Sequence, residues 1–232
     1  MKILGIDTTS KFLCIGLYDD GKIFGYNLEL GKLQSSLLVP TIKRILEALK
    51  WRLQGIDYFA CGLGPGSFTG IRVGLSAVKG LSWSLNKPVI GVPSLDALAR
   101  NAVEFNGWLI PVIDAKRSLI YCGIYKNTKG ILKKAGPYML LNKEELFKKA
   151  KPGSIFFGDA LGVYKQEITK FVPGAACLER DYWYLKPHNL IISALEKLKN
   201  KEITDTFRVK PIYLYPDECQ IKNQKSKCKI QK

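Results

Sequence analysis

Two aspartates at the ends of apolar segments are the side chains best placed for chemistry in this sequence. Asp7 closes the segment Lys2–Asp7, and Asp114 closes Val112-Ile113-Asp114. A carboxylate at a strand end, followed by a tight turn, can hold a metal ion or polarise water, while the turn amides bind phosphate. Either residue could instead cap its own turn through an Asx bond. Neither following turn carries a glycine, which disfavours close approach of a phosphate.

A repeat with a constant offset contains both aspartates. Ile6-Asp7 matches Ile113-Asp114, and Gly16-Leu17-Tyr18 matches Gly123-Ile124-Tyr125, each pair 107 residues apart. Each copy has the pattern strand, acid, short turn, strand. Such a duplication is typical of the actin-like, sugar-kinase and Hsp70 architecture, an α/β fold of two ribonuclease-H-like lobes whose acids face a cleft. We expect lobes at residues 1–104 and 105–215, with the last helix packing back on the first lobe. Residues 216–232 form a basic tail.

A glycine-rich loop, Gly64–Gly74, lies between a predicted strand, Tyr58–Leu63, and a predicted helix that ends at Leu85. This is the setting in which a helix N-terminus captures an anion. A Walker loop would need lysine where Ile71 stands, and a dinucleotide fingerprint would need glycine at Thr69, so both motifs are excluded. Small residues along one helical stripe indicate close approach of another backbone, within the chain or from a second subunit. The stripe comprises Gly70, Gly74, Ala77 and Gly80.

Metal and nucleophile chemistry has few residues to draw on. The one histidine, His188, follows Pro187 at the start of a predicted helix, and the cysteines form no CxxC pair. A zinc site needs about four clustered nitrogen or sulfur ligands. A serine or cysteine nucleophile would depend on His188. We therefore expect no metal ion and no cofactor.

The chain is strongly basic. Its 232 residues carry 36 basic and 20 acidic side chains, a net charge of +16, mostly in the second half. This excess suits RNA or an acidic protein as partner, or serves solubility alone. No apolar run could cross a bilayer and the start lacks a signal segment, so we expect a cytoplasmic protein without membrane contact. The segment Lys126–Ala150 is rich in lysine and has no clear periodicity, and its role stays unassigned.

Four segments, in the same order along the chain, resemble the TsaB (YeaZ) family of tRNA threonylcarbamoyladenosine biosynthesis proteins. They are Ile3–Thr8, Gly64–Ala77, Val112–Arg117 and Pro211–Leu214. The resemblance implies a degenerate relative of TsaD, the subunit that transfers threonylcarbamoyl to the adenosine beside the anticodon. In agreement, the sequence has no HxxxH pair, and Gln34 stands where many relatives have histidine.

The resemblance further implies a scaffold without catalytic activity. Such a protein binds TsaD as a heterodimer, joins TsaE in a larger complex, meets tRNA through that complex and is a homodimer in isolation. Two other readings stay open: a nucleotide-dependent ATPase or phosphotransferase of the same superfamily, and an RNA-binding module.

Two predicted helices, Ser35–Leu49 and Gly70–Leu85, are the expected partner surface, unless both are used entirely by the chain's own core. The expected interface residues are Leu38, Ile42, Ile45, Leu49, Gly70, Val73, Gly74, Ala77 and Leu81. The expected remnant of a nucleotide cleft comprises Asp7, Thr8, Asp114 and Gly158.

Overall fold

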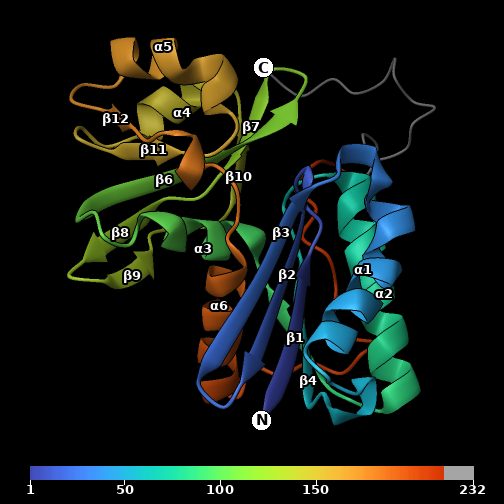
Figure 1. The fold of residues 1–232 in the computed structure, drawn as a ribbon. Coiled ribbons are helices and arrows are strands. Elements are labelled where there is room, and N and C mark those ends of the chain that lie inside the picture. Colours follow the sequence, from blue (N-terminus) through green and yellow to red (C-terminus); the bar gives the residue numbers. More distant parts are fainter. Residues whose placement is uncertain (217–232) are drawn as a thin grey trace.

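Residues 1–216 are described by the computed structural model, in which two β-sheets and their helices form two lobes (Figure 1). The first sheet has the order β3-β2-β1-β4-β5. Its strands are β1 (Lys2–Asp7), β2 (Phe12–Asp19), β3 (Lys22–Glu29), β4 (Tyr58–Gly62) and β5 (Val89–Val92). The accompanying helices are α1 (Gln34–Ala48), α2 (Phe68–Leu85) and α3 (Ser94–Ala99).

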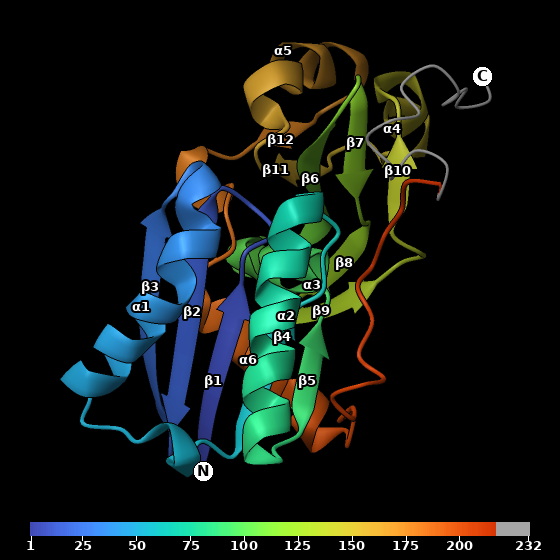
Figure 2. The ribbon, with the colours of Figure 1, turned by 90° about the vertical axis from the view of Figure 1, so that its right-hand side faces the viewer.

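The first sheet is covered by helices on both faces. Side chains alternate along β2, so that Leu13, Ile15 and Leu17 face the core under α1 and α2, whereas Cys14 faces the other side. That other side is covered by α6 (Pro187–Lys199), although α6 follows the second lobe in the chain. Figure 2 shows α1 and α2 in front of the sheet and α6 behind it. A side chain at Gly16 would overlap α6, so glycine here permits the close contact.

The second sheet repeats the order of the first. Its main path is β10-β7-β6-β11-β12, with β6 antiparallel to β7 and parallel to β11, as β1 is antiparallel to β2 and parallel to β4. Its strands are β6 (Gly107–Lys116), β7 (Leu119–Cys122), β8 (Tyr125–Thr128), β9 (Ile131–Lys134), β10 (Met139–Leu141), β11 (Ile155–Phe157) and β12 (Ala176–Cys177). Helices α4 (Lys143–Lys149) and α5 (Leu161–Phe171) cover one face. The two matching sheets confirm the predicted fold class.

The repeat differs between the lobes in its register. Asp7 ends β1 and pairs with Cys14. Asp114 pairs with Ile120, and a bulge between Asp114 and Lys116 carries β6 past the aspartate. A bulge adds one residue to one strand and re-aims the side chains beside it. The two aspartates therefore occupy equivalent strands but different local geometries.

The described residues leave some predictions open. Every helix within residues 1–216 is too short or too polar to cross a membrane. The division at residues 104 and 105 stays a prediction, and the basic tail from residue 217 lies outside the described residues.

Candidate functional site

The carboxylate of Asp7 is buried and fully engaged within the chain. Its Oδ1 accepts hydrogen bonds from the Thr9 amide (2.8 Å) and hydroxyl (2.7 Å), and its Oδ2 accepts one from Ser94 Oγ (2.6 Å). Burial raises the pKa of Asp7, although these bonds act in the opposite direction. A side chain at Gly62 would overlap the carboxylate. Asp7 thus ties the β1–β2 turn to the start of α3.

The glycine-rich loop wraps around the end of β1. The Ser67 amide donates to the Thr9 carbonyl (2.7 Å), and Thr8 Oγ1 donates to the Gly70 carbonyl (2.6 Å). Ser67 also caps α2, since its hydroxyl accepts from the Gly70 amide (3.2 Å). A Cβ at Gly70 or Gly74 would lie less than 3.0 Å from Thr8. Glycine at these two positions therefore allows the residue after β1, Thr8, to pack closely against α2.

In the second lobe, Asp114 and Asp159 share one small network. Asp114 accepts from Lys116 Nζ (2.6 Å) and from the Lys116 amide (2.8 Å), while its own amide donates to Asp159 Oδ1 (2.9 Å). Burial raises the pKa of Asp159. Gly158 has φ of +123° and lies over the Val112 carbonyl, which explains glycine at this turn. Asp159 is a residue that the sequence reasoning missed; the signal was an acid just after β11, the parallel neighbour of β6.

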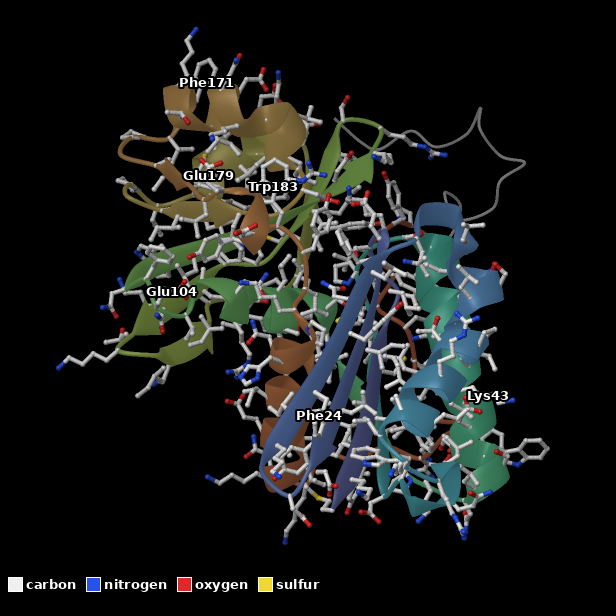
Figure 3. All side chains as sticks on the ribbon, viewed as in Figure 1. Phe24, Lys43, Glu104, Phe171, Glu179 and Trp183 are labelled. Atoms are coloured by element: carbon white, nitrogen blue, oxygen red, sulfur yellow. The ribbon has the colours of Figure 1, made fainter. Side chains whose placement is uncertain are left out.

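A narrow cavity lies between the lobes, with a volume of about 20 Å³. This space suits a single water, whereas ligand pockets measure about 300–1,000 Å³. Trp183, labelled in Figure 3, is one of its lining residues. The full lining is Thr9, Ser10, Ser94, Leu98, Ile113, Asp159, Trp183, Tyr184 and Leu185. None of the four predicted cleft residues is among them; instead their neighbours Thr9 and Asp159 line the cavity.

A larger cavity, of about 200 Å³, lies between α3, α6 and the β8–β9 hairpin. One lining carboxylate, Asp96, accepts hydrogen bonds from the hydroxyls of Tyr125 and Tyr138, both at 2.7 Å. Arg100 is paired with Glu196. Asp96 therefore joins α3 to two tyrosines, and Arg100, directly after α3, joins it to α6. Across residues 1–216, no three His, Cys, Asp or Glu side chains gather as a metal site would require.

The predicted helices α1 and α2 exist within two residues of their expected bounds, but the faces differ from expectation. Leu38 and Ile42 are buried under the sheet, and Gly70 and Gly74 are buried against Thr8. These four belong to the chain's own core, because an amphipathic helix turns its most apolar stripe toward the sheet it covers. The partly exposed remainder of the predicted set is Ile45, Leu49, Val73, Ala77 and Leu81.

The outer face of α1 and α2 carries exposed apolar residues beyond the expected interface residues. Val39 is 63% exposed and Trp83 is 69% exposed. Figure 3 shows Lys43 on the same outward side of α1. Gln34, at the start of α1, is buried and donates from Nε2 to the Ser10 carbonyl (2.8 Å), which docks α1 on the β1–β2 turn.

Comparison with known proteins extends over nearly the whole chain. The family model described as TsaD, tRNA N6-adenosine threonylcarbamoyltransferase, matches residues 31–203. The tRNA threonylcarbamoyladenosine biosynthesis protein TsaB of Bacillus subtilis is 33% identical over 96% of this chain and 97% of its own length. The chain belongs to the TsaB (YeaZ) family. The resemblance seen in the sequence is therefore confirmed.

Other TsaB relatives agree. TsaB of Buchnera aphidicola subsp. Schizaphis graminum is 30% identical over 71% of this chain and 81% of its own length. The structure of YeaZ from Pseudomonas aeruginosa is 26% identical, has a TM-score of 0.80 and covers 92% of this chain and 99% of that one. The two-lobed arrangement described above is thus shared with a solved TsaB-family structure.

Proposed function

We propose that this TsaB-family chain acts in tRNA threonylcarbamoyladenosine biosynthesis as a non-catalytic partner that supports TsaD together with TsaE. The observation that carries the proposal is the filled cleft. The cleft has a volume of about 20 Å³, and both carboxylate oxygens of Asp7 accept hydrogen bonds from the chain itself. An ATPase or phosphotransferase of the same superfamily, the alternative, would need room for a nucleotide between the lobes.

We place the partner surface on the outer face of α1 and α2. Val39, Gly80 and Trp83 are exposed, and Ala77 of α2 is partly exposed. Exposed apolar patches on a soluble protein mark contact sites, and small residues let a second helix approach closely. TsaD is matched by the same family model, so two related surfaces can meet in a heterodimer or, in isolation, in a homodimer of this chain.

The first experiment tests this surface with a matched pair of variants. Val39 is 63% exposed, and Val163, on α5 of the other lobe, is 65% exposed. We expect Val39→Arg to abolish co-purification with TsaD, whereas Val163→Arg retains it. Trp83→Ala should raise the Kd by about 30-fold, since a central aromatic anchor contributes about 2 kcal/mol or more. Equal binding by the two valine variants would refute this location.

The second experiment tests the absence of catalysis. A tRNA modification assay with TsaC, TsaD and TsaE should lose most of its yield when this chain is omitted. The purified chain alone should hydrolyse no ATP above background. Hydrolysis that Asp159→Asn abolishes would favour the enzyme reading, because Asp159 is the carboxylate that lines the cavity.

A further inference from the structure

The hairpin formed by β8 and β9 extends the second sheet beside β6 and carries a lysine-rich face. Side chains alternate along β8, so Lys126 and Thr128 are exposed while Tyr125 and Asn127 are buried. Ile131 and Lys133 of β9 pair with the exposed residues of β8 and are exposed on the same face. Lys129 lies at the tip, in the two-residue turn that it forms with Gly130. The sequence from Ala115 to Lys143 contains no acidic residue at all.

No acidic side chain within residues 1–216 neutralises the lysines of this face. Lys126 and Lys133 are directly opposite each other across the hairpin, an arrangement of like charges that destabilises a strand pair. Within residues 1–216, the ion pairs involve none of Lys126, Lys129 and Lys133. The Lys126 ammonium lies 4.8 Å from the Trp108 ring centroid, which holds it on the exposed face. The nearest preceding acid, Asp114, is paired with Lys116, and Glu104, the next one back, accepts a hydrogen bond from Tyr182.

The hairpin is anchored as a preformed element. The buried Asn127 donates from Nδ2 to the carbonyls of Val103 (2.6 Å) and Phe105 (2.8 Å). The Lys129 amide donates to Asn106 Oδ1 (2.7 Å). These bonds fix both the strand and the tip against the loop before β6. The charges are therefore presented on a fixed backbone, which reduces the ordering cost of binding.

We propose that the exposed face of the β8–β9 hairpin, with Lys126, Lys129 and Lys133, binds the phosphate backbone of RNA. Lysine is a compact point charge on a flexible stem and binds phosphates without needing a fixed geometry. An acidic protein would need an apolar centre to its interface, and this face offers one exposed apolar side chain, Ile131. The proposal rests on the proposed function, which supplies tRNA as the polyanion.

The position of the hairpin permits RNA and protein contacts at the same time. Figure 1 shows β8 and β9 on the opposite side of the molecule from α1 and α2, and Figure 2 agrees, with the hairpin behind α2. A partner seated on α1 and α2 would leave the lysine face open. The chain would then add a basic contact to a complex that holds tRNA.

The test measures binding of an unmodified tRNA transcript to the full chain by fluorescence anisotropy, between 50 and 200 mM KCl. The hairpin variant combines Lys126→Gln, Lys129→Gln and Lys133→Gln. Each lysine–phosphate contact contributes about one unit to the slope of log K against log salt. We expect the hairpin variant to flatten that slope by about two to three units and to weaken binding at least about tenfold at the lowest salt.

The matched control combines Lys22→Gln, Lys50→Gln and Lys210→Gln, three exposed lysines outside the hairpin that remove the same net charge. We expect it to change the slope by less than one unit. An equal effect of both triple variants would overturn the proposal, because binding would then follow net charge alone. A hairpin variant that keeps wild-type tRNA binding but loses poly-L-glutamate binding would overturn it too, in favour of an acidic protein.

Measuring TsaD binding by the same variants distinguishes a failure of this proposal from a failure of the proposed function. The hairpin variant should bind TsaD as the wild type does. Val39→Arg should lose TsaD and retain the salt slope for tRNA. Failure of the TsaD arm alone refutes the proposed function, whereas an unchanged slope in the hairpin variant refutes the RNA surface.

Discussion

Two glycines of α2 differ in their surroundings and provide a matched pair of alanine substitutions. A methyl group at Gly70 would overlap the backbone carbonyl of Thr8, which cannot move without shifting the end of β1. A methyl group at Gly80 would meet nothing within 4 Å. The same chemical change is therefore made once against the chain's own core and once at the surface.

The expected magnitudes follow from these contacts. Overpacking against a fixed backbone costs about 3 kcal/mol, and loss of the Thr8 hydroxyl bond to Gly70 costs about 1 kcal/mol more. The higher helix propensity of alanine compared with glycine stabilises the folded state by about 1 kcal/mol. Gly70→Ala should thus lower the free energy of unfolding by about 3 kcal/mol and the Tm by about 6–12 °C. Gly80→Ala should gain about 1 kcal/mol and raise the Tm by about 2–4 °C.

Thermal melting followed by circular dichroism measures both variants, and pull-down with TsaD is done in parallel below both melting temperatures. We expect folded Gly70→Ala protein to retain its partner. A Gly70→Ala variant that melts with the wild type but no longer binds TsaD would refute the reasoning, since Gly70 would then face the partner. Equal shifts of both variants would refute it as well.

Three further substitutions test other contacts. Asn101 is buried and donates from Nδ2 to two backbone carbonyls of the segment before α6, so Asn101→Ala should lower the free energy of unfolding in urea by about 2–4 kcal/mol. Tyr138→Phe removes one donor from Asp96 but keeps the ring, and should cost about 1–2 kcal/mol in the same assay. Burial raises the pKa of Asp7 above 3.8, so the native carboxyl binds a proton more tightly than the unfolded one. The contribution of Asp7 to the free energy of unfolding therefore increases as pH falls through the raised pKa. The urea midpoint of Asp7→Asn should not show this increase. A difference between the midpoints of Asp7→Asn and the wild type that stays constant between pH 4 and 8 would contradict this assignment.

Apolar periodicity predicts the helices of the proposed partner surface but not which of their residues are exposed. The spacing of apolar residues predicted both helices correctly and identified Leu38 and Ile42 as the strongest stripe. That same strength is why they are unavailable to a partner, because the sheet beneath needs covering and takes the most apolar face first. Val39 and Trp83 stand outside the stripe, and their exposure depends on how the two helices lie on the sheet.

The glycine loop shows a different limit. Its residues were enough to exclude the Walker and dinucleotide motifs, since those depend on residue type at fixed spacing. What occupies the loop depends on Thr8 and Thr9, which are about 60 residues away in the chain. The residues of the loop alone do not indicate a contact with a segment so distant in the chain.

The sequence by itself determined the two lobes, the family and the concentration of positive charge, because repeats, motifs and composition are properties of the chain order. Only the tertiary structure decided that Asp7 is bound by Ser94 and that Lys126 and Lys133 meet on one exposed ribbon. These outcomes depend on pairings between distant segments, whose energies come from burial and hydrogen bonding in three dimensions. Whether a carboxylate serves chemistry or holds the fold is settled by which donors the folded chain brings to it.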